Sequence, residues 1–143
     1  MYDTIVVPVD ASPEARVAAE QARDLAADLG STVHLLYVVP AIGYLFGVDT
    51  VVDIDRAATR MTELADDVFE GSGVNAHTAV RRGDREEITL EFLEDVEADL
   101  VVLGRKESPD VRDYLLWSGP SQIVRKSDVS VLLAHPDVDD GDA

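Results

Sequence analysis

The chain contains no cysteine, and this absence excludes disulfide scaffolds, thiolate metal sites and enzymes with a cysteine nucleophile. Lysine is also scarce, because only two of the 12 basic residues are lysines. Acidic residues number 29, which gives a formal net charge of −17 and a sequence pI near 4.2. A surface with this charge repels a phosphate backbone, so we do not expect nucleic acid as a partner.

Long hydrophobic runs are missing as well. The longest uncharged stretch, residues 29–48, is interrupted by glycine, proline, serine and histidine, which a membrane-spanning helix disfavours. The amino terminus lacks a basic segment followed by an apolar one, so we expect no secretory signal. The sequence therefore predicts a cytoplasmic protein without a membrane partner.

The residues that are present are those of a packed protein, since 46% of the 143 residues are hydrophobic. The carboxylate-dense and lysine-poor composition resembles that of cytosolic proteins from salt-accumulating halophiles. In molar salt the Debye length falls to about 3 Å, so repulsion between these carboxylates is mostly screened. We predict one halophilic domain over residues 1–136, followed by an acidic tail at 137–143. An ordinary acidic protein is the alternative to the halophilic interpretation.

Hydrophobic patterning predicts five strands, of which the first is a continuous apolar run. They lie at residues 5–9, 32–39, 74–80, 100–103 and 129–134. Helical periodicity fills the intervals. One helix begins after Ser12 and ends at Gly30, the next runs from Ile54 to Val68, a third is capped by Asp84, and a short helix falls near 119–127.

Strands that alternate with helices predict an α/β fold, in which a parallel sheet is covered on both faces and the crossovers are right-handed. Ligands in such folds bind at the carboxyl ends of the strands. Asp10 ends the first strand, where a carboxylate can bind a ribose, a metal or a phosphoryl group. A receiver-type phosphorylation site is excluded, because Ala11, Arg81 and His135 stand near the places where acidic residues and a lysine are required. The other interpretation of Asp10 is that it stabilises the turn before Ser12.

Five segments carry a resemblance to the universal stress protein family, in the family's order and spacing. They read IVVPVDAS at 5–12, HLLYVV at 34–39, Gly-Asp at 83–84, ADLVVLG at 98–104 and KSDVSVLL at 126–133. The resemblance implies an adenine nucleotide alpha hydrolase-like, three-layer domain with a five-stranded sheet in the order 3-2-1-4-5. It also implies a homodimer built along the fifth strand, from Val129 to Ala134, and, in one branch, ATP held by the loop after the fourth strand.

That loop departs from the pattern of the ATP-binding branch, which is a glycine, two residues, a second glycine, nine residues and then Gly-Ser or Gly-Thr. Gly104 fits the first position, but Glu107 replaces the second glycine and Trp117-Ser118 replaces the last pair. Glycines let backbone amides approach a phosphate closely. A carboxylate at about 4 Å would instead repel it by about 4 kcal/mol at an effective dielectric near 20. The sequence therefore predicts that ATP binding is weakened or lost.

Residue-by-residue transfer from the resemblance gives a set of candidate nucleotide contacts. In this set Val38 would contact adenine through its backbone, Asp10 would line the base and ribose, and Ser118 would face phosphate. Val38 as an ordinary strand residue and Ser118 as a helix cap are the alternatives. The full set is Pro8, Val9, Asp10, Val38, Leu103, Gly104, Ser118 and Gly119.

Two groups of cations follow strands. Arg105 and Lys106 can supply charge in place of the missing glycines, and Arg81, Arg82 and Arg85 follow the third strand. Strands three and four are about 14 Å apart in the implied order, so the two groups need not meet on one ligand. Solvated loop charges are the alternative for both.

No hydrolase or phosphotransferase motif is present, and His34, His77 and His135 have no metal-site spacing. We therefore expect no metal, no catalytic residue and no enzyme, with a slow ATPase as a less favoured option. Trp117 is interpreted as a packing or dimer contact. Residues 40–48 are unusually apolar for a connection, so they predict a surface for a protein partner or for self-association. A cover over the ligand site, or an early turn of the second helix, is the alternative.

Together these features predict a cytoplasmic, dimeric stress-response regulator that acts through protein partners and whose ATP site is weakened or lost. The alternative is a sensor that binds ATP or another adenine nucleotide and uses Arg105 and Lys106 in place of the loop glycines.

Overall fold

The computed structural model describes residues 2–10, 13–39, 50–104 and 127–134. Its five strands form a single parallel sheet in the order β3-β2-β1-β4-β5, which confirms the predicted α/β class and strand order. The strands are β1 (Thr4–Val9), β2 (Thr32–Val39), β3 (Asn75–Arg82), β4 (Leu100–Gly104) and β5 (Ser130–Ala134).

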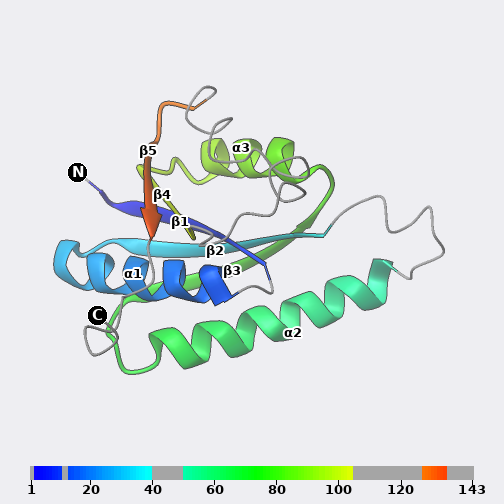
Figure 1. Cartoon of the computed structure of the whole chain (residues 1–143), viewed down its shortest axis with the longest axis horizontal. Helices are drawn as coiled ribbons and strands as arrows, with labels where there is room; N and C mark the ends of the chain where they lie inside the picture. Colours follow the sequence, from blue (N-terminus) through cyan, green and yellow to red (C-terminus); the bar gives the residue numbers. More distant parts are fainter. Residues whose placement is uncertain (1, 11–12, 40–49, 105–126, 135–143) are drawn as a thin grey trace, which may run out of the picture.

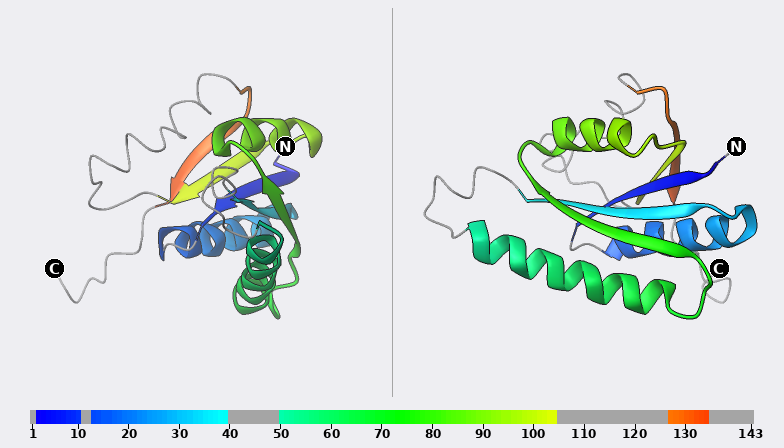
Figure 2. Two further views of the ribbon diagram at one scale, coloured as in Figure 1. Left: turned by 90° about the vertical axis from the view of Figure 1, so that its right-hand side faces the viewer. Right: turned by 180° about the vertical axis from the view of Figure 1, so that it is seen from behind.

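Helices cover both faces of the sheet (Figures 1 and 2). Helices α1 (Pro13–Leu29) and α2 (Thr50–Phe69) lie side by side on one face, and α3 (Arg85–Asp95) lies on the other. The short helix expected near 119–127 falls almost entirely on residues outside the described part. Across the described residues, no helix combines the length and apolar character that crossing a bilayer requires.

Strand β1 occupies the middle of the sheet because every residue of its apolar run can be buried. Ile5, Val6 and Val7 have no exposed surface, and Val9 is only 3% exposed. Alternate side chains point to opposite faces, so Ile5, Val7 and Val9 pack with α1 and α2 while Val6 packs with Phe92 of α3. A strand with neighbours on both edges and helices on both faces requires this continuous apolar sequence.

The two edge strands differ in character. β3 is polar and mostly exposed, and it continues to Arg82, two residues beyond its predicted end, so Arg81 and Arg82 belong to the strand and do not follow it. Backbone pairing of Arg81 with Val38 extends the strand, and an edge strand tolerates charged side chains. β5 instead exposes Leu132 and Leu133, by 36% and 49%.

Helix boundaries follow local signals with one exception. The side chain of Asp84 accepts a hydrogen bond from the amide of Glu87 at 2.9 Å, so Asp84 is the N-cap of α3, as predicted. α2 ends at Phe69, shortly before Gly71, whose φ is +74°. However, α2 begins at Thr50, four residues before the predicted start, because the apolar periodicity used for the prediction becomes regular only from Ile54.

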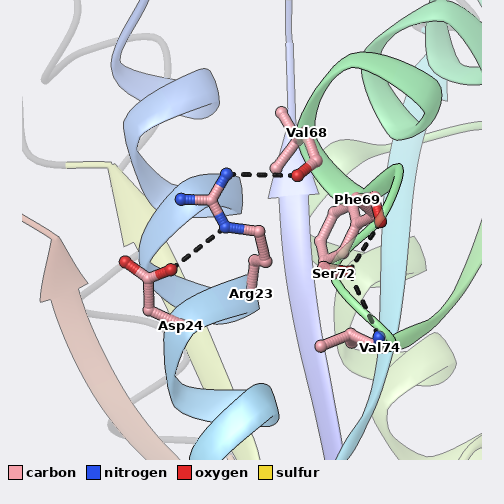
Figure 3. A network of polar contacts seen from close by, with 6 residues as sticks. All are labelled: Arg23, Asp24, Val68, Phe69, Ser72 and Val74. Atoms are coloured by element: carbon pink, nitrogen blue, oxygen red, sulfur yellow. Dashed lines mark hydrogen bonds and ion pairs between the residues drawn. The ribbon is translucent and has the colours of Figure 1, made fainter.

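The carboxyl end of α2 has no basic residue of its own, and Arg23 of α1 supplies one (Figure 3). Its Nη1 donates to the carbonyl oxygen of Val68 at 3.1 Å, and its Nε pairs with Asp24 at 3.0 Å. Beyond the helix, the Ser72 hydroxyl donates to the Phe69 carbonyl at 2.6 Å and accepts from the Val74 amide at 3.1 Å. These bonds satisfy backbone groups that a helix end leaves without a partner.

Asp99 joins β1 to β4 at the amino ends of the strands. Its Oδ2 accepts hydrogen bonds from the amides of Asp3 at 2.9 Å and Thr4 at 3.0 Å, and its own amide donates to the Thr4 carbonyl at 2.9 Å. The segment at 98–104 that carries the family resemblance therefore contains a residue with a clear structural role.

Candidate functional site

Strand order reverses at β1, the first strand of the chain, which lies between β2 and β4. β1 pairs with β2 along its whole length, but with β4 only at Ile5 and Val6. β4 in turn stays paired with β5 as far as Gly104. Ligands of open α/β sheets bind at such a reversal, at the carboxyl ends of the strands. We call this place, marked by Asp10, Val38 and Gly104, the switch point.

The residues at the end of β1 divide into buried and accessible ones. Pro8 and Val9 are buried, so only their backbone can face a ligand. Asp10 is the first polar residue after the strand, and its side chain is 32% exposed. Because Val9 pairs with Tyr37, Asp10 lies level with Val38, which packs into the core beneath α3. The register of β1 and β2 thus places Asp10 and Val38 at the same level of the sheet.

On the β4 side, Leu103 is buried and Gly104 contacts the first turn of α1. A Cβ at position 104 would lie 2.6 Å from the carbonyl carbon of Glu14 and 2.9 Å from its Cβ, closer than side chains pack. Glycine is therefore required here by the close approach of the α1 backbone. This requirement does not depend on a bound phosphate, which the sequence pattern alone had suggested as the reason for Gly104.

The structure adds Arg85 to the switch point. As the first residue of α3, it reaches the end of β1, where its Nη2 lies 3.4 Å from Oδ2 of Asp10. Both side chains are about one-third exposed, at 34% and 32%. The turn that leads into α3 is held by a hydrogen bond from the Gly83 amide to the Val39 carbonyl at 3.0 Å.

The sequence pattern places Arg81, Arg82 and Arg85 together after the third strand, and for Arg81 and Arg82 this prediction is wrong. Arg81 lies in β3, and its guanidinium is 5.6 Å from the ring centre of Phe92, whereas Arg85 pairs with Asp10. The Gly-Asp pair before the helix is the sequence signal that separates Arg85 from the other two arginines. Asp84 caps α3, which makes Arg85 the first helical residue and places it near the ends of β2 and β1.

The whole described domain matches one protein family. The sequence fits the model of the Universal stress protein family over residues 1–135. The chain belongs to the universal stress protein family. Universal stress protein G of Salmonella typhimurium is 29% identical to it, over 94% of this chain and 100% of the relative. Universal stress protein Sll1654 of Synechocystis is 33% identical, over 93% of this chain and 85% of the relative.

Solved structures share the fold of this universal stress protein. The protein MJ0577 superimposes with a TM-score of 0.77 and 21% identity, over 97% of this chain and 99% of its own. A universal stress protein in complex with cAMP gives a TM-score of 0.73 and 22% identity, over 95% and 98%. A family member from Arabidopsis thaliana with AMP bound gives 0.67 and 15%, over 96% and 94%.

His34 and His77 form a stacked pair on neighbouring strands, away from the switch point. Their ring centres are 5.2 Å apart, and Phe92 of α3 meets the His34 ring edge-on at 6.0 Å. Burial, with a smaller contribution from the nearby His77, lowers the pKa of His34. In the part of the chain that the structure describes, no three histidine or carboxylate side chains gather as a metal site would require.

A surface hollow of about 410 Å³ lies against α2 and is lined by side chains from that helix alone among the described residues: Asp55, Arg56, Thr59, Arg60 and Glu63. It is wide open and shares no residue with the switch point, so we do not assign it to the family's ligand site. Several predicted positions lie outside the described residues, namely 40–48, Arg105, Lys106, Trp117, Ser118, Gly119 and the tail at 137–143.

Proposed function

We propose that this universal stress protein is a cytoplasmic, non-enzymatic regulator that acts as a dimer through protein partners and binds ATP only weakly. One observation supports this most directly. Two of the residues that the resemblance would assign to the ligand already have partners within the chain, because Asp10 pairs with Arg85 and Gly104 packs against Glu14. A triphosphate would also meet Glu107 in place of a glycine.

The experiment that tests weak ATP binding is heat unfolding in molar KCl, with and without millimolar ATP and Mg²⁺. A ligand at 100 times its Kd would add about 2.7 kcal/mol of stability, which is a rise of several degrees in Tm at this size. We expect no such rise with ATP. A clear increase would contradict the proposal and direct attention to Arg105 and Lys106.

Strand β5 supports the dimer. It is an edge strand that carries exposed Leu132 and Leu133, and an edge of this kind can pair with a second copy. We expect Leu133→Arg to produce a monomer in sedimentation experiments. Leu29→Arg is the matched control, because Leu29 is equally exposed, at 51%, but lies at the end of α1. If Leu133→Arg remains dimeric, the interface lies elsewhere. The apolar segment 40–48 is the surface that we propose for other protein partners.

The alternative function is an adenine-nucleotide sensor, and a separate observation favours it. Asp10 and Val38 lie level at the switch point, and solved relatives of the same fold hold cAMP or AMP. Both ligands are monophosphates, so they need fewer phosphate contacts from the substituted loop after β4 than ATP does. In the same heat-unfolding experiment, a rise in Tm with AMP but not with ATP would favour this function over the first.

A further inference from the structure

We infer that Arg85 is a specificity-determining residue of the switch point, and that it favours a nucleotide whose phosphate lies next to the ribose over the neutral nucleoside. The inference rests on the nucleotide-binding alternative of the proposed function and assigns a ligand class to that site. It concerns a residue outside the loop after β4, where Arg105 and Lys106 were expected to provide the positive charge.

The position of the guanidinium is the first step. Nη2 of Arg85 lies 3.4 Å from Oδ2 of Asp10, and Asp10 lies level with Val38. Asp10 and Val38 are the residues that would line a base and a ribose. The positive charge therefore lies at the nucleoside end of the site, on the β2 side of β1. A phosphate attached to a ribose bound there would lie close to the guanidinium.

The turn before α3 holds this cation in place, which is the second step. The Gly83 amide is hydrogen-bonded to Val39, and Gly83 has a φ of +146°, where a side chain would be strained and would contact Ile88. Asp84 then caps the helix that Arg85 begins. With its backbone fixed in this way, Arg85 loses less conformational entropy on binding an anion than a cation in an open loop would lose.

Charge balance gives the direction of the preference. A ribose hydroxyl that donates a hydrogen bond to Asp10 competes with Arg85 for the carboxylate and so weakens their ion pair. A neutral nucleoside brings no anion that could replace this contact of the half-buried guanidinium. A phosphate does offer one, because the planar guanidinium can bind two phosphate oxygens at once. A charge-assisted contact of this kind corresponds to about tenfold to hundredfold in affinity.

The test is the ratio of AMP affinity to adenosine affinity, measured by calorimetry in molar KCl for the full chain. We expect the natural protein to prefer AMP by at least about tenfold. Arg85→Gln should abolish most of this preference by weakening AMP binding while leaving adenosine binding equal or stronger. Arg85→Lys, which keeps the charge but loses the planar fork, should give an intermediate ratio.

Arg81→Gln is the matched control, because it removes the same charge from the same side of the sheet. Its guanidinium lies over Phe92 and is not paired with Asp10. It should leave the ratio unchanged. A ratio that Arg85→Gln does not alter, or that Arg81→Gln lowers equally, would overturn the role of Arg85 while nucleotide binding itself stands. If neither AMP nor adenosine binds the natural protein at millimolar concentration, the inference and the nucleotide-binding function both fail.

Discussion

At the amino ends of the strands, Asp99 accepts hydrogen bonds from the backbone amides of Asp3 and Thr4, whereas at the carboxyl ends Asp10 faces the side chain of Arg85. Backbone amides are fixed by the strand and cannot turn away from Asp99. The Arg85 side chain is one-third exposed and is not part of the strand backbone. The same residue type therefore bonds to the backbone at one end of the sheet and pairs with a side chain at the other.

Other contacts at the amino ends also involve the backbone. At the amino ends of the strands, Arg23 and Ser72 also bond to backbone groups, and the Ser31 hydroxyl donates to the Tyr2 carbonyl. A parallel sheet has its helix carboxyl ends on this side, where unpaired carbonyl oxygens need donors. Bonds to backbone groups thus hold the amino ends, whereas the pair of Asp10 and Arg85 at the carboxyl ends joins two partly exposed side chains.

The largest predicted effect concerns Gly104, which packs tightly against the backbone of α1 at the carboxyl ends of the strands. It is an exception to the difference between the two ends of the sheet. We expect Gly104→Ala to lower the free energy of unfolding by about 2 to 3 kcal/mol, since the new methyl group meets the Glu14 backbone, which cannot yield easily. Denaturant unfolding in molar KCl measures this loss. Gly71→Ala is the control, because it adds a methyl group in open space at positive φ and should cost about 1 kcal/mol. Equal losses in the two variants would refute the packing requirement.

The comparison itself is tested by removing the two aspartates. Asp99→Ala should cost about 2 kcal/mol, because two backbone amides lose a charged acceptor. Asp10→Ala should cost less than about 1 kcal/mol, because the ion pair between Asp10 and Arg85 joins two partly exposed side chains. The same unfolding experiment measures both. If Asp10→Ala proves as destabilising as Asp99→Ala, the Asp10 pair is structural and the distinction between the two ends is wrong.

A smaller effect is expected at the junction of α1 and α2. Arg23→Ala should cost about 1 kcal/mol, because the Val68 carbonyl loses its charged donor at the carboxyl end of α2. Arg16→Ala is the control on the same helix. Arg16 is 51% exposed, and within the described part of the chain its ion pairs are with the exposed carboxylates of Glu20 and Asp67, so its loss should change stability little. Equal effects would show that bonding to the backbone gives no advantage here.

The smallest effect is a pH dependence that arises in mid-sheet, between the two ends. The pKa of His34 is lowered from its usual 6.5, so the unfolded chain takes up this proton more readily than the folded one. The stability that neutral His34 provides is therefore complete above pH 6.5 and is lost as the pH falls through the lowered pKa. His34→Gln should flatten this part of the stability curve. His77→Gln, which leaves His34 half-buried as before, should flatten it less, and an unchanged curve in His34→Gln would contradict the assignment.

Much of the fold was predictable because its signals are local. The bounds of β2 are those predicted, and the apolar run of β1 identified a strand buried on both faces. Asp84 was recognised as a helix cap from its place before the helix. The end of β3 was not predicted, because arginines in an edge strand follow no apolar alternation and are held there by pairing with β2.

The sequence by itself determined where the strands and helices form, because periodicity and caps depend on residues a few positions apart. Together with the family resemblance, it also indicated that Asp10, Val38 and Gly104 belong to one site. Only the tertiary structure decided what these residues contact. Asp10 and Arg85 are 75 positions apart, and they meet because the sheet places β3, β2 and β1 side by side with α3 across one face. Gly104 faces Glu14 for the same reason, since the contact depends on how α1 packs beside β4 and leaves no trace in the neighbouring sequence.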